Sequence, residues 1–226
     1  MAEGNAETAA GRLGAGDGLL EGMRAGAVDH AAAEATRCRV VETAERLFRQ
    51  FGYLKTTVGD IAAELGMSSA NIYRFFASKA AITEAVLQKV TGEVIAEAQA
   101  IAAEPGVPAQ DKLRRVVRAC NTAICERCLA DARMQSIVLA AIEENWHVIR
   151  RHKAALREVT AAIIAEGVRS GEFDVDDPEL AALCFQHAMM SSLHPVIVEH
   201  RLREGEDIEA TLEPMLAFSF RALGAR

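Results

Sequence analysis

The sequence of 226 residues is 50 % hydrophobic and 25 % charged, with a net charge of −7. This length and composition supply enough apolar side chains for one large domain or two small ones, so we do not expect a disordered chain. No apolar run approaches the roughly 18 residues of a membrane helix and no secretory signal is recognisable, so we expect a cytoplasmic protein with no membrane partner.

The charge is unevenly distributed along the chain. Residues 1–35 carry two basic and six acidic side chains, for a net charge of −4. Residues 36–91 carry eight basic and five acidic ones, for a net charge of +3, and the rest of the chain carries −6. A basic segment attached to an acidic body is typical of a protein of which only one part meets a polyanion.

Residues 1–35 differ in composition from the rest. They contain seven glycines and few large apolar side chains, so burial offers little to offset the entropy of ordering them. We expect a flexible tail there.

Beyond residue 35, the chain has tracts rich in Ala, Leu, Glu and Arg, few aromatic residues and only five prolines. This composition favours an all-α fold.

Residues 37–51 show the apolar periodicity of an amphipathic helix, which we expect to end at Gly52. Thr57 follows as an N-cap with Asp60 three residues later, a variant of the capping box at the start of a second, short helix. Gly66 is expected to end that helix.

Ser68 is the N-cap of a third short helix, 69–75, and Ser78 caps a fourth that starts at Lys79. Two short helices joined by a glycine-containing turn and supported by a longer helix form the helix-turn-helix pattern, in which the second of the pair enters the major groove of DNA. The polar side chains of the third helix share one face and suit phosphate oxygens or base edges. We therefore predict double-stranded operator DNA as a partner, contacted by Thr57, Ser68, Ser69, Ala70, Asn71, Tyr73, Arg74 and Lys79.

Three motifs in this region carry a family resemblance. They are Phe-Gly-Tyr-x-x-Thr-Thr at 51–57, Asp-Ile-Ala at 60–62 followed by Leu-Gly-Met-Ser at 65–68, and Ile-Tyr-Arg-Phe-Phe-Ala-Ser-Lys at 72–79. With these motifs, residues 37–90 resemble the TetR family of transcriptional regulators. The resemblance implies that Thr57, Tyr73 and Lys79 contact phosphates, whereas Ser69, Ala70 and Asn71 face bases.

The same resemblance implies the domain organisation and the function. An N-terminal helix-turn-helix DNA-binding domain of three helices, 36–82, precedes a C-terminal helical domain, 83–226, which binds an effector and forms a homodimer. The implied function is that of a ligand-responsive repressor, which binds a palindromic operator as a dimer and is released by an unknown small molecule. No catalytic activity and no cofactor is implied.

Beyond residue 90 the helices are predicted from local sequence patterns, because the family motifs lie within residues 37–90. The fourth helix is expected to continue to a break at 105–108, and Gly171 and Pro195 are expected to end or kink later helices. Pro214 conflicts with the helical pattern around it. The remaining predicted helices are 111–129, 132–145, 146–170, one starting at 177–179 and one over about 208–223.

Soft and aromatic side chains in these helices suggest a pocket for an apolar or aromatic effector, although they could equally fill a solid core. The pocket residues we predict are Cys120, Met134, Trp146, His147, Phe185 and Met189. Small residues along the helix that begins near 178 would let a partner helix approach closely, so we expect the dimer interface at about 178–201 and 208–223.

Three other patterns suggest alternative chemistry. Cys120, Cys125 and Cys128 could sense oxidants or a soft metal, but helical spacing does not place them on one narrow face. Glu144 and His147 form a single Glu-x-x-His unit, which di-iron bundles use in pairs. Cys184 and His187 lack an identifiable third metal ligand. We therefore predict no metal site and no enzyme, and keep a thiol- or metal-responsive regulator, or a helical redox enzyme, as alternatives.

Overall fold

The computed structural model describes residues 15–130, 132–143 and 146–225, and gives side chains from residue 30 onward, those of residues 127 and 128 excepted. In these ranges every regular element is a helix, which confirms the predicted all-α class. None of these helices is both long enough and apolar enough to cross a membrane. The elements are α1 (Ala15–Phe51), α2 (Val58–Glu64), α3 (Ser69–Tyr73), α4 (Lys79–Ala102), α5 (Ala109–Ala123), the π-helix η1 (Ile124–Leu129), α6 (Ala132–Glu143), α7 (His147–Ser170), α8 (Pro178–Ala188), α9 (Met190–Leu193), α10 (Pro195–Arg203) and α11 (Ile208–Ala222).

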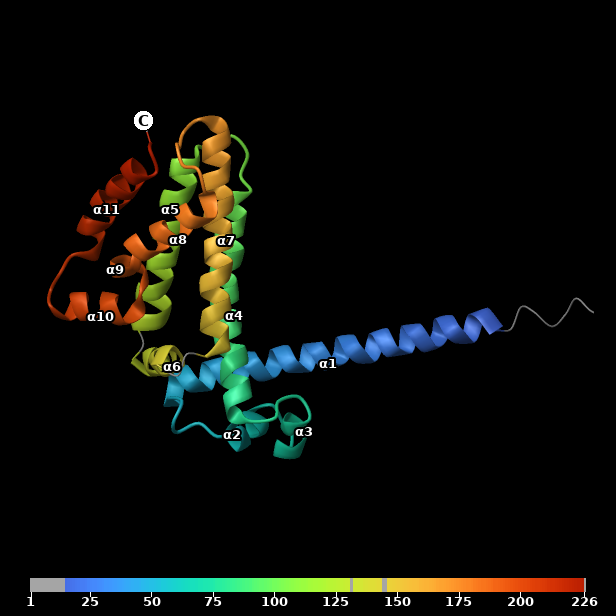
Figure 1. Cartoon of the computed structure of the whole chain (residues 1–226). Coiled ribbons are helices and arrows are strands. Elements are labelled where there is room, and N and C mark those ends of the chain that lie inside the picture. Colours follow the sequence, from blue (N-terminus) through green and yellow to red (C-terminus); the bar gives the residue numbers. More distant parts are fainter. Residues whose placement is uncertain (1–14, 131, 144–145, 226) are drawn as a thin grey trace, which may run out of the picture.

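Two long helices, α4 and α7, run side by side through the centre of the molecule (Figure 1). The C-terminal half of α1 crosses α4 near its N-terminal end, where α2 and α3 also lie. Helices α5 and α8 pack against the central pair, and α9, α10 and α11 lie on the outer side. The small unit of α1–α3 is thus carried at one end of a helical body.

The starts and stops of the first four helices follow the predicted local signals. The hydroxyls of Thr57, Ser68 and Ser78 accept backbone N–H groups at the N-termini of α2, α3 and α4. Gly52 and Gly66, with φ of +88° and +65°, follow α1 and α2. Glycine adopts this left-handed conformation without steric cost, which is why the helices stop there.

The apolar side chains form two cores that share one helix. The lower core joins α1–α3 with α6 and the start of α7, and the upper core joins α5, α7, α8 and α11. Helix α4 contributes Val86 and Leu87 to the lower core and Val94 and Ala98 to the upper one. The predicted domain boundary between residues 82 and 83 therefore falls within a continuous helix.

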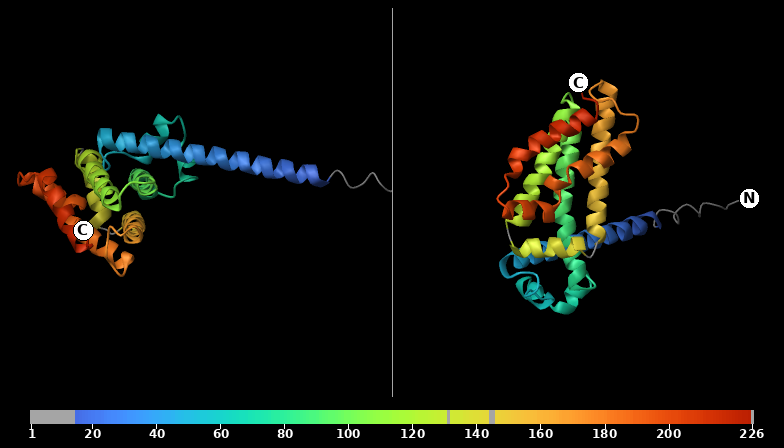
Figure 2. Two further views of the ribbon diagram at one scale, coloured as in Figure 1. Left: turned by 90° about the horizontal axis from the view of Figure 1, so that it is seen from above. Right: turned by 60° about the vertical axis from the view of Figure 1, so that its left-hand side comes forward.

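Helix α1 begins earlier than the sequence patterns indicated. We predicted a flexible tail over residues 1–35, but the structure has residues 15–35 in helical conformation, projecting away from the body (Figure 2). Residues 1–14 lie outside the described part of the chain. The alanine-rich segment at 31–35 favours helix, and extending a helix that is already nucleated by its packed half costs little.

Two prolines in the C-terminal region have different effects. Helix α9 ends at Leu193 and α10 begins at Pro195, as expected from the missing backbone N–H of proline. Pro214 lies inside α11, which continues through it to Ala222. The predicted helix 111–129 is also continuous, but its last six residues are π-helical.

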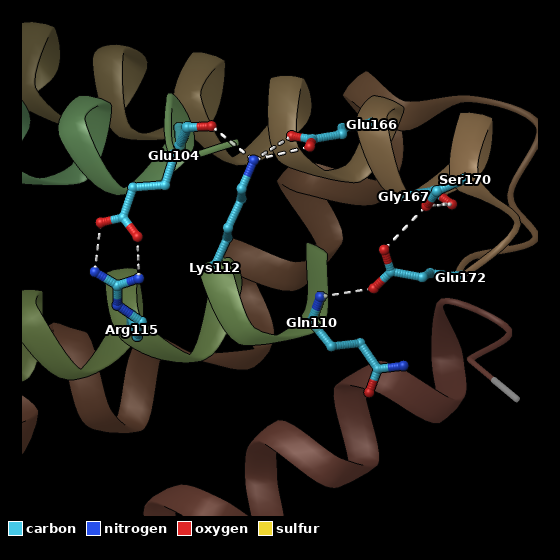
Figure 3. A network of polar contacts seen from close by, with 9 residues as sticks. Glu104, Gln110, Lys112, Arg115, Glu166, Gly167, Ser170 and Glu172 are labelled. Carbon is cyan, nitrogen blue, oxygen red and sulfur yellow. Dashed lines mark hydrogen bonds and ion pairs between the residues drawn. The ribbon is translucent and has the colours of Figure 1, made fainter. Parts of the chain in front are cut away.

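A buried lysine connects three helices at the far end of the body (Figure 3). The Nζ atom of Lys112 on α5 lies 2.8 Å and 2.7 Å from the two carboxylate oxygens of Glu166 on α7, and 3.0 Å from the backbone oxygen of Ala102 at the end of α4. The Lys112 side chain is 2 % exposed. The hydrogen bond from Lys112 to Ala102 fixes the C-terminal end of α4 against α5, and the ion pair with Glu166 joins α5 to α7.

Candidate nucleic-acid interface and ligand cavity

Helix α3 presents a polar face to solvent, as its periodicity predicts. Ile72 is fully buried against the lower core, and this anchor fixes the orientation of the short helix. The opposite side carries the predicted contact residues. Ser68, Ala70, Tyr73 and Arg74 are exposed, and Ser69 and Asn71 are half-buried.

The N-terminus of α2 lies beside this face. Asp60 Oδ2 accepts the backbone N–H of Thr57 at 2.7 Å, and Thr57 Oγ1 accepts that of Asp60 at 3.1 Å, so the capping box is complete. The hydrogen bonds that the backbone N–H and the hydroxyl of Thr57 donate to the Asp60 carboxylate lower the pKa of Asp60. A Cβ placed on Gly59 would lie 3.4 Å from Thr57 Oγ1 and 3.9 Å from Ser69 Oγ, so α2 and α3 approach closely here.

Lys79, the first residue of α4, is held in place by Tyr53. Its Nζ atom donates to the backbone oxygen of Tyr53 and lies 4.1 Å above the centre of the Tyr53 ring. Partial burial lowers the pKa of Lys79, while the charge of Asp60 raises it. Lys79 and Asp60 therefore interact electrostatically, which places the predicted phosphate contacts Thr57 and Lys79 in one region of the surface.

The basic side chains of residues 36–91 fall into two groups. Arg37, Arg46, Arg49 and Lys89 form ion pairs with glutamates. Arg37 also donates to the backbone oxygen of Phe75 and stacks on Phe76, which ties α1 to the segment after α3. Among the described residues, no ion pair involves the second group, which consists of Arg39, Lys55, Arg74 and Lys79. Arg39 and Lys55 are exposed and were not among our predicted contacts.

A cavity of about 240 Å³ lies between α4, α5, α6, α7 and the segment from α8 to α10. Its walls are mainly apolar, and they include buried side chains such as Val94, Cys120 and Ala123. The polar lining residues are Thr91, His152, Lys153, Gln186, His187 and His194. Lys153 and His187 are exposed, which places them at the mouth of the cavity.

Two imidazoles of the cavity have unsatisfied nitrogens. The Nδ1 atoms of His152 and His194 are buried and have no hydrogen-bond partner within the described residues. Burial lowers the pKa of His152 to about 4, against the opposing effect of a hydrogen bond to the Thr91 backbone. Burial and the charge of Lys153 also lower the pKa of His194. Both imidazoles are therefore neutral near pH 7.

Of the six predicted pocket residues, only Cys120 lines this cavity. Met134 is fully buried in the lower core, and Phe185 and Met189 are buried in the upper one. Trp146 packs against the lower core, and the exposed His147 lies with its Nδ1 atom 3.7 Å from Glu84 Oε1. Periodicity identifies buried faces but does not show which of them border a cavity, so the sequence did not single out the lining residues His152 and Lys153.

Two thiols of the predicted cysteine trio, Cys120 and Cys125, are poorly placed for redox or metal chemistry. Burial raises the pKa of Cys120 to about 12 and also raises that of Cys125, so few thiolates form at neutral pH. The side chain of Cys128 and the whole of Glu144 lie outside the described residues. Over the residues that are described, no three His, Cys, Asp or Glu side chains gather into a group that could hold a metal ion.

An open groove separates α8 from α11 on the outer side of the body. It is lined by Leu180, Cys184 and Ala188 from α8 and by Phe218 from α11, among others. The Leu180 and Phe218 side chains are 56 % and 58 % exposed. Large apolar side chains exposed together in this way mark an interaction surface.

Comparison with known proteins gives matches in both halves of the chain. Residues 40–86 match the family described as bacterial regulatory proteins, tetR family. Residues 109–213 match the tetracyclin repressor-like C-terminal domain. The two matches lie on either side of the C-terminal half of α4, which joins the two cores.

The chain is also similar to individual transcriptional regulators in sequence, and to a solved repressor structure in fold. The chain is 23 % identical to the HTH-type transcriptional regulator YhgD of Bacillus subtilis, over 77 % of this chain and 91 % of the relative. It is 28 % identical to the HTH-type transcriptional repressor KstR2 of Rhodococcus jostii, over 64 % and 72 %. Among solved structures, SmeT, the repressor of a multidrug efflux pump of Stenotrophomonas maltophilia, superimposes with a TM-score of 0.62 at 19 % identity, over 84 % of this chain and 91 % of SmeT.

Proposed function

Because this chain belongs to the TetR family of transcriptional regulators and is itself a DNA-binding regulator, not an enzyme, we propose that it represses transcription as a homodimer on a palindromic operator. A small molecule that enters the cavity beside α4 releases it. The observation that carries the DNA-binding part is the exposed polar face of α3, which is fixed by the buried Ile72 and flanked by the N-termini of α2 and α4.

On the DNA, we assign two kinds of contact. Thr57, Tyr73 and Lys79 contact phosphates, with help from the free backbone N–H groups at the N-termini of α2 and α4. Ser69, Ala70, Asn71 and Arg74 face the major groove, and Ser68 holds the start of α3 as its N-cap. Arg39 and Lys55 add positive charge on the same small unit.

Replacing Asn71 with alanine tests the base contact. The Asn71 side chain is half-buried on the polar face of α3, and its amide suits the N6 and N7 atoms of adenine. We expect a loss of about 1–3 kcal/mol in operator binding and a relaxed preference at one base pair of each half-site. Selection from a randomised operator library measures that preference. An unchanged preference in Asn71→Ala would refute the assignment of Asn71 to a base.

Replacing Lys79 with alanine tests the phosphate contact. The loss of one charge from each subunit at the DNA surface should weaken binding to all sequences alike. It should reduce the slope of log K against log salt by about one per subunit, and so by about two for the dimer. Titrations of operator and unrelated duplex over a range of salt concentrations measure both effects. Lys89→Ala is the control, because Lys89 is paired with Glu45 on α1; a slope changed equally by both variants would argue against a specific role of Lys79.

The groove between α8 and α11 supports the dimer. A single helix-turn-helix buries too little surface for a specific complex, so members of such classes bind two half-sites related by the symmetry of the protein. The exposed Leu180 and Phe218 supply an apolar surface that a second copy of the chain covers through the same two helices.

A further inference from the structure

Four features of the cavity beside α4 indicate the chemical class of the molecule that fills it. The cavity has an apolar interior, and its described lining includes a single lysine and no arginine. That lysine lies at the mouth, and two imidazoles with buried, unpartnered nitrogens line the same cavity. Each feature restricts the effector further. This inference rests on the proposed function, since it concerns the molecule that releases the operator.

The interior of the cavity favours an apolar ligand of modest size. The inner wall is formed by residues such as Val90, Val94 and Ala123, whose side chains are buried. The volume of about 240 Å³ lies just below the range of about 300–1,000 Å³ that is common for drug-sized ligands. A single ring or a chain of eight to ten carbons is therefore the suitable size, by order of magnitude.

The charges around the cavity are unbalanced. Among the described residues that line the cavity there is no aspartate or glutamate, and Lys153 is the one lysine or arginine. The lining imidazoles of His152 and His194 are neutral near pH 7. Lys153 also has no ion pair with any other described residue. Lys153 lines the same cavity as His152 and His194, and its charge adds to burial in lowering the pKa of both imidazoles.

The polar atoms at this end of the cavity are incompletely hydrogen-bonded. The Nδ1 atoms of His152 and His194 lack partners among the described residues. The Gln186 amide donates to the backbone oxygen of Lys153 at 3.1 Å, which fixes the wall between α7 and α8. A buried polar atom without a partner is costly, so a ligand group that satisfies it gains affinity.

We propose that the effector is an apolar monocarboxylic acid, with its hydrocarbon part between α4, α5 and α7 and its carboxylate at Lys153, beside His152 and His194. The carboxylate neutralises the cation at the mouth. It also provides an acceptor for an N–H of His194, whereas the neutral His152 already donates its one N–H to the Thr91 backbone. The hydrocarbon part displaces water from the apolar interior. A neutral ligand of the same length would leave the Lys153 charge without a partner.

The test compares two eight-carbon probes that differ in the head group, sodium octanoate and octan-1-ol, by calorimetric titration into the full-length protein. We expect octanoate to bind at least tenfold more tightly than octanol. In Lys153→Met this preference should disappear, with octanol binding retained. Arg151→Met is the matched control, because Arg151 is exposed on the same helix, removes the same charge and does not line the cavity.

The outcomes separate this inference from the proposed function. If octanol binds as tightly as octanoate, or if Lys153→Met and Arg151→Met have the same effect, the carboxylate assignment is wrong, whereas a ligand-binding cavity remains. If neither probe binds, the inference fails and the proposed ligand response loses its support. The DNA-binding part of the proposed function is tested separately by Asn71→Ala.

Discussion

Replacing Glu166 with leucine should destabilise the fold by about 3 kcal/mol or more, because it leaves the ammonium group of Lys112 buried without its counterion. Lys112 is 2 % exposed, and of its hydrogen bonds to described residues it would keep only the one to the backbone oxygen of Ala102. In the reverse variant, Lys112→Met, the buried charge itself is removed and the remaining Glu166, at 36 % exposure, is solvated. We therefore expect Lys112→Met to be clearly less destabilising than Glu166→Leu.

Urea denaturation measures both variants, at one fixed protein concentration because the stability of the proposed dimer would depend on concentration. Glu104→Leu is the control for the loss of a glutamate. Glu104 makes a two-pronged pair with Arg115, with both distances 2.6 Å, but at the surface, so its removal should have little effect (Figure 3). Equal losses for Glu166→Leu and Glu104→Leu would show that burial of Lys112 does not control the energetics of this pair.

Replacing Phe218 with glutamate should produce monomers and reduce operator affinity by about 100-fold or more. Phe218 is 58 % exposed and lies in the groove with Leu180, so a charge there disrupts the proposed interface without disturbing the core. Each monomer then binds one half-site alone and loses the gain in affinity that comes from linking two binding units. The same substitution at Ala188, which packs against the upper core, would also perturb folding.

Sedimentation and operator titration measure the two effects of Phe218→Glu. Leu202→Glu is the control, because Leu202 is also an exposed large apolar side chain, at 45 %, but lies on α10 outside the groove. It should remain dimeric and bind the operator normally. A parent protein that sediments as a monomer at micromolar concentration, or a Phe218→Glu variant that stays dimeric, would contradict the assignment of the interface.

The features that could be predicted from the sequence are those that depend on neighbouring residues. Thr57, Ser68 and Ser78 each cap a helix through the residue three positions further on, and Gly52 stops α1 through its own backbone conformation. Such signals are complete within a few residues, so the helix-turn-helix unit was located correctly. Only its details differ, since α3 ends at Tyr73 and not at 75.

The features that were missed depend on contacts between distant parts of the chain. Lys112 has the sequence context of an exposed cation on an amphipathic helix. Its counterion in the buried position is Glu166, which lies 54 residues away in the sequence. The cavity likewise depends on how α4, α7 and the segment after α8 fit together, which no periodicity records. For this reason His152 was overlooked, while Met134 was assigned to a pocket although it fills a core.

Because α4 belongs to both cores, it would act as a lever arm in the proposed ligand response. Its 24 residues span about 36 Å, and its C-terminal end is the fulcrum, where Lys112 holds Ala102. Thr91 at the cavity lies about half as far from this fulcrum as Lys79 at the DNA-facing end. A displacement of about 1 Å at the cavity would thus become about 2 Å at Lys79, more than half of the roughly 3.4 Å rise of a base pair. The mechanical advantage of one unbroken helix would let a small ligand misalign two operator-reading units.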